Sequence, residues 1–110
     1  MRAIEVESRN HTPQAKKFEL AAVYCRVSSE EQEQNQNIKN QINAIKTFVD
    51  LQKSDGSRLE IKDWYLDDGV SGTIPLERRH AGSKLLLDAS DGKFNIVLGV
   101  YPSNGWLAAG

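Results

Sequence analysis

The chain has 110 residues, a length typical of one small domain or of part of a larger protein. Its charged (26%) and hydrophobic (39%) fractions are those of ordinary globular proteins, and its net charge is −1. Acidic and basic residues are nearly balanced in each part of the chain, which excludes a strongly basic nucleic-acid-binding arm. The single Cys25 excludes an internal disulfide, and no apolar run approaches the roughly 18 residues of a membrane span, so we expect a cytoplasmic protein without membrane contact.

The first half of the chain predicts one strand and one helix. Residues 1–18 mix charges, Asn, Thr and Pro without a sustained period, which indicates a loosely ordered N-terminal extension. Residues 20–27, "LAAVYCRV", form a continuous apolar run typical of a strand buried on both faces of a parallel sheet. Apolar residues then recur every three or four positions from Ile38 to Val49, which predicts an amphipathic helix over 37–52.

The second half predicts two more strands and another helix. "LEIKDWYL" (59–66) is a second strand followed by the turn-rich "DDGVSGT". The spacing of Ala81, Leu85, Leu86 and Ala89 predicts a helix, and "FNIVLGVY" (94–101) is a third strand. The alternating order predicts an α/β fold with a parallel sheet between two layers of helices, while residues 102–110 form a tail without any period.

The carboxyl ends of the first two strands carry the chemistry. Ligands and reacting groups gather at this edge of a parallel sheet, so residues 26–29 and 67–73 should lie close together. A serine beside an arginine favours attack on a phosphate, because the guanidinium fork matches phosphate oxygens. His11 and His80 are not placed like a triad base, one Cys and two isolated His argue against a zinc site, and the nucleotide-binding glycine motifs are absent.

Five segments in order resemble the N-terminal catalytic domain of the serine recombinases, the resolvases and invertases. They are "YCRVSSEEQ", "NQINAIKTF", "YLDDGVSGT", "LERR" and "GKFNIVLGVY", within residues 19–101. The "DDGVSGT" loop is most similar to that of large serine integrases and transposon recombinases. The resemblance implies a resolvase-like catalytic domain over 19–101.

The resemblance also implies roles for individual residues. Ser28 matches the nucleophile, which attacks a DNA phosphodiester, becomes joined to the 5′ phosphate and releases a 3′ hydroxyl without metal or other cofactor. The other matched positions are two phosphate-binding arginines, an acidic loop residue, two polar network residues and a strand tyrosine: Arg26, Arg78, Asp67, Gln32, Gln41 and Tyr24. If the sequence is aligned with the shorter loops of resolvases, Asp68 matches the acidic loop residue in place of Asp67.

The segment after the third strand departs from the family. Family members continue with a segment resembling "K-x-D-R-L-x-R", whereas this chain has "VYPSNGWLAAG", without any acidic or basic residue. Two further parts of family members have no match in this sequence. One is the long helix through which they form dimers and tetramers, and the other is the C-terminal DNA-binding domain. We therefore expect a C-terminally truncated domain with weak or absent DNA binding and with impaired strand cleavage. In family members the aspartate and two arginines of this segment complete the phosphate site, and each lost hydrogen-bond donor costs about 2.7 to 4 kcal/mol of transition-state stabilisation.

Structural explanations compete with these roles. A serine after a strand is usually a turn or helix-cap residue, and Ser29 is a candidate cap. Cys25 is most simply a small buried apolar residue, and Tyr24 is also suited to core packing. Two other functions stay open: a non-catalytic fragment that acts only by protein interaction, and a small phosphate-handling enzyme such as a phosphatase.

Overall fold

The computed structural model describes residues 2–6, 18–33 and 37–100. In chain order its elements are β1 (Arg2–Val6), β2 (Glu19–Val27), α1 (Ser29–Glu33), α2 (Ile38–Ser54), β3 (Leu59–Asp68), the 3-10 turn η1 (Leu76–Arg78), α3 (His80–Ser90) and β4 (Ile96–Val100). The tail expected at 102–110 and most of the expected N-terminal extension lie outside these residues. Among the described residues, no helix is both long and apolar enough to cross a membrane.

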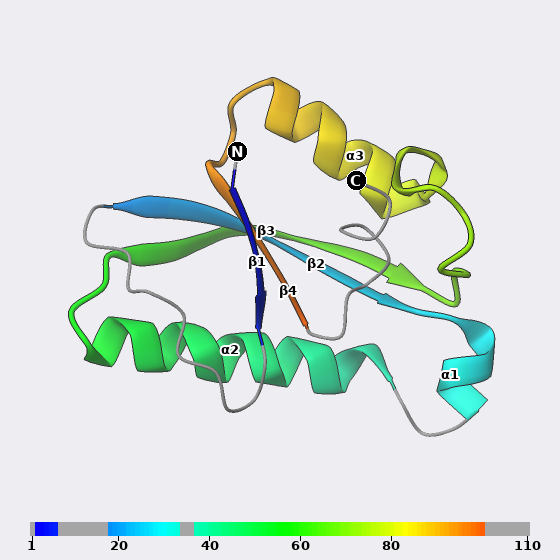
Figure 1. Cartoon of the computed structure of the whole chain (residues 1–110), viewed down its shortest axis with the longest axis horizontal. Coiled ribbons are helices and arrows are strands. Elements are labelled where there is room, and N and C mark those ends of the chain that lie inside the picture. Colours follow the sequence, from blue (N-terminus) through cyan, green and yellow to red (C-terminus); the bar gives the residue numbers. More distant parts are fainter. Residues whose placement is uncertain (1, 7–17, 34–36, 101–110) are drawn as a thin grey trace.

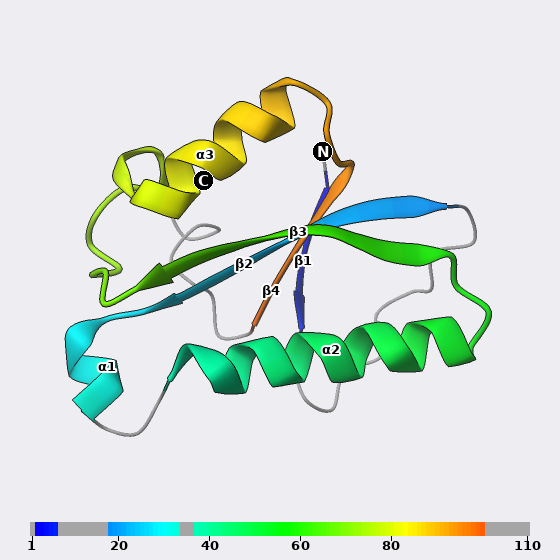
Figure 2. The same ribbon diagram turned by 180° about the vertical axis from the view of Figure 1, so that it is seen from behind.

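The described strands form one parallel sheet between two helices. The strand order is β1-β4-β2-β3, and all three pairings are parallel. Figures 1 and 2 show α2 along one face of the sheet and α3 along the other. The predicted α/β fold with helices on both sides of a parallel sheet is therefore confirmed.

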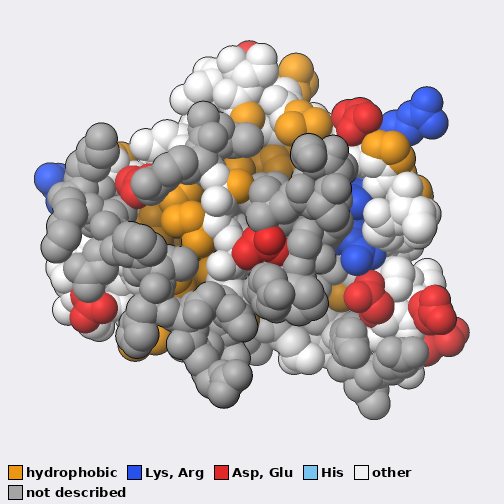
Figure 3. Space-filling view, in the orientation of Figure 1, with side chains coloured by type: hydrophobic (Ala, Val, Ile, Leu, Met, Phe, Trp, Pro, Cys, Tyr) orange, Lys and Arg blue, Asp and Glu red, His pale blue; other side chains and the backbone are white. Residues whose placement is uncertain are grey.

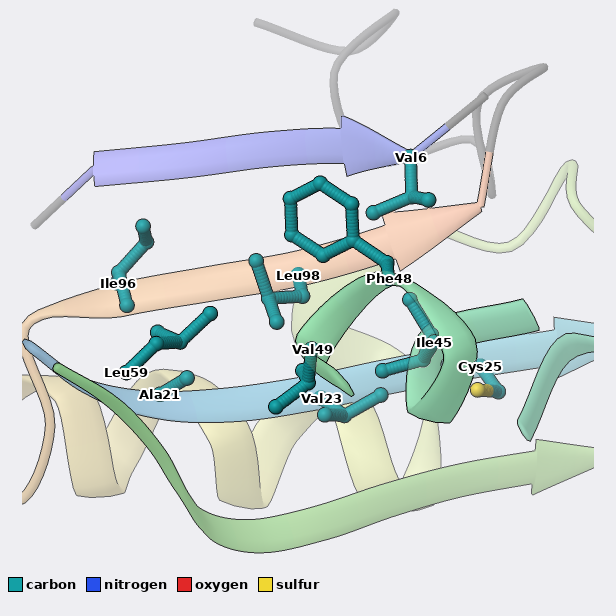
Figure 4. Close-up of a cluster of buried hydrophobic side chains, with 10 residues drawn as sticks. All are labelled: Val6, Ala21, Val23, Cys25, Ile45, Phe48, Val49, Leu59, Ile96 and Leu98. Atoms are coloured by element: carbon teal, nitrogen blue, oxygen red, sulfur yellow. The ribbon is translucent and has the colours of Figure 1, made fainter. Parts of the chain in front are cut away.

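Strand β2 lies at the centre because its side chains are apolar on both faces. Ala21, Val23 and Cys25 face α2, whereas Ala22 and Tyr24 face α3, and all five are fully buried. Figure 4 shows the α2-side cluster, in which helix residues meet the strands. The continuous apolar run in the sequence thus reflects burial on two sides, as expected for a central parallel strand.

Helix α2 begins and ends on local signals. The Asn37 side chain accepts a hydrogen bond of 3.0 Å from the Asn40 backbone N–H, which satisfies one of the unpaired donors of the first turn. Ile45, Phe48 and Val49 supply the buried face of the helix. Gly56 has a φ of +89°, a left-handed conformation that glycine adopts without strain, and it turns the chain toward β3.

Strand β1 differs from the sequence prediction. Residues 2–6 were expected in a loosely ordered extension, yet they pair with β4 from Arg2↔Ile96 to Val6↔Val100. Val6 is buried, and Ile4 is half-buried against the α2-side cluster. Two alternating apolar residues among charged neighbours are a weak strand signal, and only the tertiary partner makes them a strand. As a result, β1 covers the outer edge of β4.

The third predicted strand is shorter than expected. Phe94 and Asn95 precede β4 instead of belonging to it. The Phe94 ring packs edge-on against Tyr65, with ring centroids 6.0 Å apart. Asn95 forms a reciprocal pair with Leu20, because its side-chain oxygen accepts from the Leu20 N–H at 2.9 Å and its own N–H donates to the Leu20 carbonyl at 2.9 Å. These contacts align the start of β4 with β2.

Candidate functional site

The candidate site lies where β2 and β3 end side by side. Arg26 pairs with Asp67 and Val27 pairs with Asp68, so both strands deliver polar residues to the same edge. The predicted shared edge is thus confirmed. In Figure 3, Lys and Arg side chains lie close to Asp and Glu side chains on the right of the molecule, the side on which Figure 1 places these strand ends.

Ser28 leaves β2 and caps the short helix α1. Its Oγ accepts a hydrogen bond of 3.0 Å from the Glu31 backbone N–H, and the Glu31 Oε1 accepts one of 2.7 Å from the Ser28 N–H. This reciprocal pattern is a capping box. The cap role that the sequence suggested for Ser29 therefore belongs to Ser28. The hydrogen bond from the Ser28 N–H is the main reason that the pKa of Glu31 lies below its ordinary value.

Arg26 is fixed at both its backbone and its side chain. The Gln41 side chain accepts from the Arg26 N–H at 3.3 Å and donates to the Arg26 carbonyl at 2.7 Å, which ties the end of β2 to α2. The guanidinium NH1 donates to the Val70 carbonyl at 2.8 Å and to Glu31 Oε1 at 3.3 Å. A Cβ on Gly72 would lie 3.2 Å from the guanidinium carbon, so the loop packs closely on this side chain.

A second cluster is buried beneath the same edge. The Tyr24 hydroxyl donates to Asp67 Oδ2 at 2.8 Å and accepts from Arg79 NH1 at 3.1 Å. Asp67 and Arg79 are only 2% and 1% exposed, so the pair is almost completely shielded from water. Burial, and then the hydrogen bond to Asp67, raise the pKa of Tyr24, while Arg79 acts in the opposite direction. The phenol is therefore a neutral donor to the carboxylate.

Asp67 also caps helix α3 from a distance. Its two oxygens accept hydrogen bonds from the backbone N–H groups of Ala81 (2.8 Å) and Gly82 (3.0 Å). These groups have no partner within the helix, and a carboxylate at a helix N-terminus is also favoured by the helix dipole. The N-cap residue of α3, Arg79, makes no side-chain cap of its own. The carboxylate of β3 thus replaces a local cap.

The two arginines hold the loop that follows β3. Arg79 Nε donates to the Ile74 carbonyl at 2.8 Å, and its NH2 donates to the Gly72 carbonyl at 3.2 Å. Arg26 holds the same loop at Val70. The "GVSGT" turn is therefore positioned between Arg26 and the buried Arg79.

Most of the residues predicted for the site come together at this edge, but Arg78 does not. Its side chain is exposed at the end of η1, whereas the neighbouring Arg79 turns into the buried cluster. Asp67 is the buried member of the aspartate pair, and the exposed Asp68 accepts a hydrogen bond from Gln32 instead.

Glu31 and Arg79 were missed from the sequence. Glu31 had a readable signal, because Ser-x-x-Glu is the capping-box pattern. Two adjacent arginines in "LERR" carry no signal that tells which of them turns inward.

Among residues 2–6, 18–33 and 37–100, no group of three or more His, Cys, Asp or Glu side chains is arranged to hold a metal ion.

Comparison with known proteins assigns the chain to a family. A family model described as the resolvase N-terminal domain matches residues 21–103, which include both clusters and the loop between them. No curated protein and no solved structure matches the chain. Because the family match covers most of the sequence, the chain belongs to the resolvase N-terminal domain family, which links it to DNA and to site-specific recombination.

Proposed function

We propose that this chain is a serine recombinase catalytic domain with Ser28 as the nucleophile and with impaired strand cleavage. The Ser28 hydroxyl gives its proton to a water molecule, its Oγ forms a bond to the phosphorus of a DNA phosphodiester, and the bond from phosphorus to the 3′ oxygen breaks. The 3′ oxygen takes up a proton from water and leaves as a hydroxyl, and the protein stays joined to the 5′ phosphate. Attack by the 3′ hydroxyl of another strand reverses these steps, so neither a metal nor a nucleotide is consumed.

The proximity of Ser28 and Arg26 is the observation that carries this proposal. Both residues contact the same Glu31 carboxylate, through the Ser28 N–H at 2.7 Å and Arg26 NH1 at 3.3 Å. A guanidinium that shares an acceptor with the backbone of the serine suits a phosphate that gains negative charge in the transition state. In this proposal Arg26 contacts the phosphate. Arg78, the second arginine that the resemblance implies, does not join this cluster and would approach the bound DNA from the exposed end of η1.

The buried cluster has a positioning role in this proposal. Tyr24, Asp67 and Arg79 hold the start of α3 and the loop 70–74, and this loop in turn holds Arg26. Gln41 holds the backbone of Arg26, while Gln32 reaches Asp68. The similarity of the "DDGVSGT" loop further suggests the group of large serine integrases and transposon recombinases, whose members assemble as dimers and tetramers.

Covalent trapping tests the role of Ser28. The chain would be incubated with a library of nicked DNA duplexes of random sequence, denatured, and captured through an affinity tag, and the attached DNA would be sequenced. Because strand cleavage is expected to be impaired, we expect a low yield of an adduct that survives denaturation, with a 5′-phosphoserine at residue 28 by mass spectrometry. The variant Ser28→Ala should form none, whereas Ser29→Ala, which changes the neighbouring exposed serine, should behave like the wild type.

Two outcomes would contradict the proposal. An adduct that persists in Ser28→Ala would assign the nucleophile to another residue. A wild-type chain that forms no adduct with any duplex would favour the alternative, a non-catalytic fragment that acts by protein interaction. One observation supports that alternative: the sequence after β4, "YPSNGWLAAG", contains no charged side chain to add to the phosphate site.

A further inference from the structure

The Glu31 carboxylate occupies a position between the two groups that matter most for a bound phosphate. Its Oε1 accepts from the Ser28 N–H and from Arg26 NH1. A backbone N–H and a guanidinium that converge on one anionic oxygen are the kind of donors that bind a phosphate oxygen in proteins. The carboxylate therefore interacts with the same donors that a phosphate at this site would use.

The contacts of Glu31 differ in strength and in accessibility. The Ser28 N–H contact is short, at 2.7 Å, whereas the Arg26 contact is longer, at 3.3 Å. The Arg26 side chain is only 10% exposed, but that of Glu31 is 37% exposed. A partly exposed carboxylate can rotate toward water at low cost, while the arginine stays held by the Val70 carbonyl at 2.8 Å.

We propose that Glu31 is a positioning residue that acts as an internal substitute for the phosphate, holding Arg26 and Ser28 in place until a phosphate displaces its carboxylate. This proposal rests on the proposed function of the same site. It adds a competitor for the phosphate, supplied by the chain itself. A negative charge that holds the donors in the resting state must weaken the binding of any other anion there.

The substitution Glu31→Gln separates the charge from the cap. A glutamine oxygen can still accept from the Ser28 N–H, since capping boxes use Glu or Gln at this position, and the Glu31 backbone N–H to Ser28 Oγ is unaffected. Only the negative charge beside Arg26 is lost. Glu30→Gln is the matched control, because it removes the same charge from the exposed neighbouring residue of the same helix.

Sulfate is the probe for the experiment, because it is a phosphate-like dianion that does not titrate near neutral pH. Binding would be followed by NMR at the Ser28 backbone amide and at the Arg26 Nε resonance. We expect Glu31→Gln to bind sulfate about two- to fivefold more tightly than the wild type, the range expected for a partly exposed ion pair. Glu30→Gln should leave the sulfate affinity at these resonances close to that of the wild type.

A double-mutant cycle distinguishes competition from a change in structure. In an Arg26→Gln background the proposal requires that Glu31→Gln improves sulfate binding less than it does in the wild type, because one of the two donors for which they compete is gone. The Arg26 Nε resonance should also shift in Glu31→Gln before any sulfate is added, which a remote structural effect would not produce.

The result is independent of DNA cleavage. Equal effects of Glu31→Gln and Glu30→Gln, or no sulfate response at Ser28 in either variant, would overturn the proposal even if covalent trapping succeeds. Conversely, tighter sulfate binding in Glu31→Gln without any DNA adduct would support the competitor role and count against the catalytic function alone.

Discussion

Replacing Asp67 with alanine should remove much of the stability of the fold. Asp67 is 2% exposed and accepts hydrogen bonds from the Tyr24 hydroxyl and from the backbone N–H groups of Ala81 and Gly82. Each buried donor left without an acceptor costs about 1–3 kcal/mol, and breaking a buried charged network typically costs about 3–5 kcal/mol. We expect a loss of about 3–5 kcal/mol, against a total of roughly 5–15 kcal/mol for a domain.

The neighbouring aspartate is the control for this prediction. Asp68 is exposed, and its hydrogen-bond partner, Gln32, is also at the surface, so Asp68→Ala should change stability by no more than about 0.5 kcal/mol. Urea denaturation followed by circular dichroism would measure both variants. With a slope of about 2 kcal/mol per molar urea, the midpoint of Asp67→Ala should fall by about 2 M.

If Asp67→Ala does not fold, Asp67→Asn provides the measurement. Asparagine keeps one acceptor oxygen for the N-terminus of α3 but loses the charge, so its loss should be smaller than that of alanine. The reasoning would be refuted if the two alanine variants shifted the midpoint equally, or if Asp67→Ala cost less than about 1 kcal/mol. In that case the buried network would not be the structural support of this edge.

Four further predictions concern other residues. In urea denaturation, Arg79→Met should lower the free energy of unfolding by about 3–5 kcal/mol and Arg78→Met by no more than about 0.5 kcal/mol, because Arg79 is the buried and hydrogen-bonded arginine of the pair. A larger loss in Arg78→Met than in Arg79→Met would show that Arg78 is the arginine in the core. Gly82→Ala should destabilise the fold by about 1–3 kcal/mol and so lower the midpoint of thermal unfolding. Alanine favours helices, but its Cβ at this position would clash with the Leu76 backbone carbonyl of η1, and an unchanged midpoint would contradict that contact. The pKa of Glu31 is lowered in the folded chain, mainly by a backbone hydrogen bond, so the ionised side chain stabilises the fold above the ordinary value of 4.5 and this stabilisation is lost as the pH falls below it. Lowering the pH should therefore destabilise the wild type more than Glu31→Gln, and parallel curves of stability against pH for the two proteins would contradict this prediction. Burial raises the pKa of the Cys25 thiol to about 12, so a disulfide reagent at pH 8 should label it only in urea, and rapid labelling of the folded chain would show that β2 is accessible.

The parts of the fold that were predictable from the sequence are those with a strong period. The run "LAAVYCRV" and the spacing from Ile38 to Val49 each indicate one type of element, and β2 and α2 lie where these patterns predict them. Strand β1 was missed because its five residues contain only two inward apolar side chains, Ile4 and Val6, and their partner strand is far away in the chain. Local sequence carries no record of such a partner.

The site was predictable in its position but not in its internal contacts. The carboxyl ends of parallel strands share an edge of the sheet, so the sequence alone predicts that Arg26 and Asp67 lie together, as they do. The burial of each side chain is not predictable from the sequence, because Arg78 and Arg79 are chemically identical neighbours, as are Asp67 and Asp68. In each pair the buried member is the one that contacts the Tyr24 hydroxyl, and that contact depends on tertiary packing.

The pairing of β1 with β4 also has a consequence for the order in which the fold is completed. Arg2 pairs with Ile96, 94 positions later in the chain, so the first strand to leave the ribosome must wait for the last described one. At about 5–20 residues per second, this wait is roughly 5–20 s. During that interval Ile4 and Val6 are exposed, and closing so long a loop makes the docking of β1 a slow, late event in folding. A nascent chain tethered before residue 96 should therefore bind chaperones through its N-terminal segment, and this binding should cease once β4 is released.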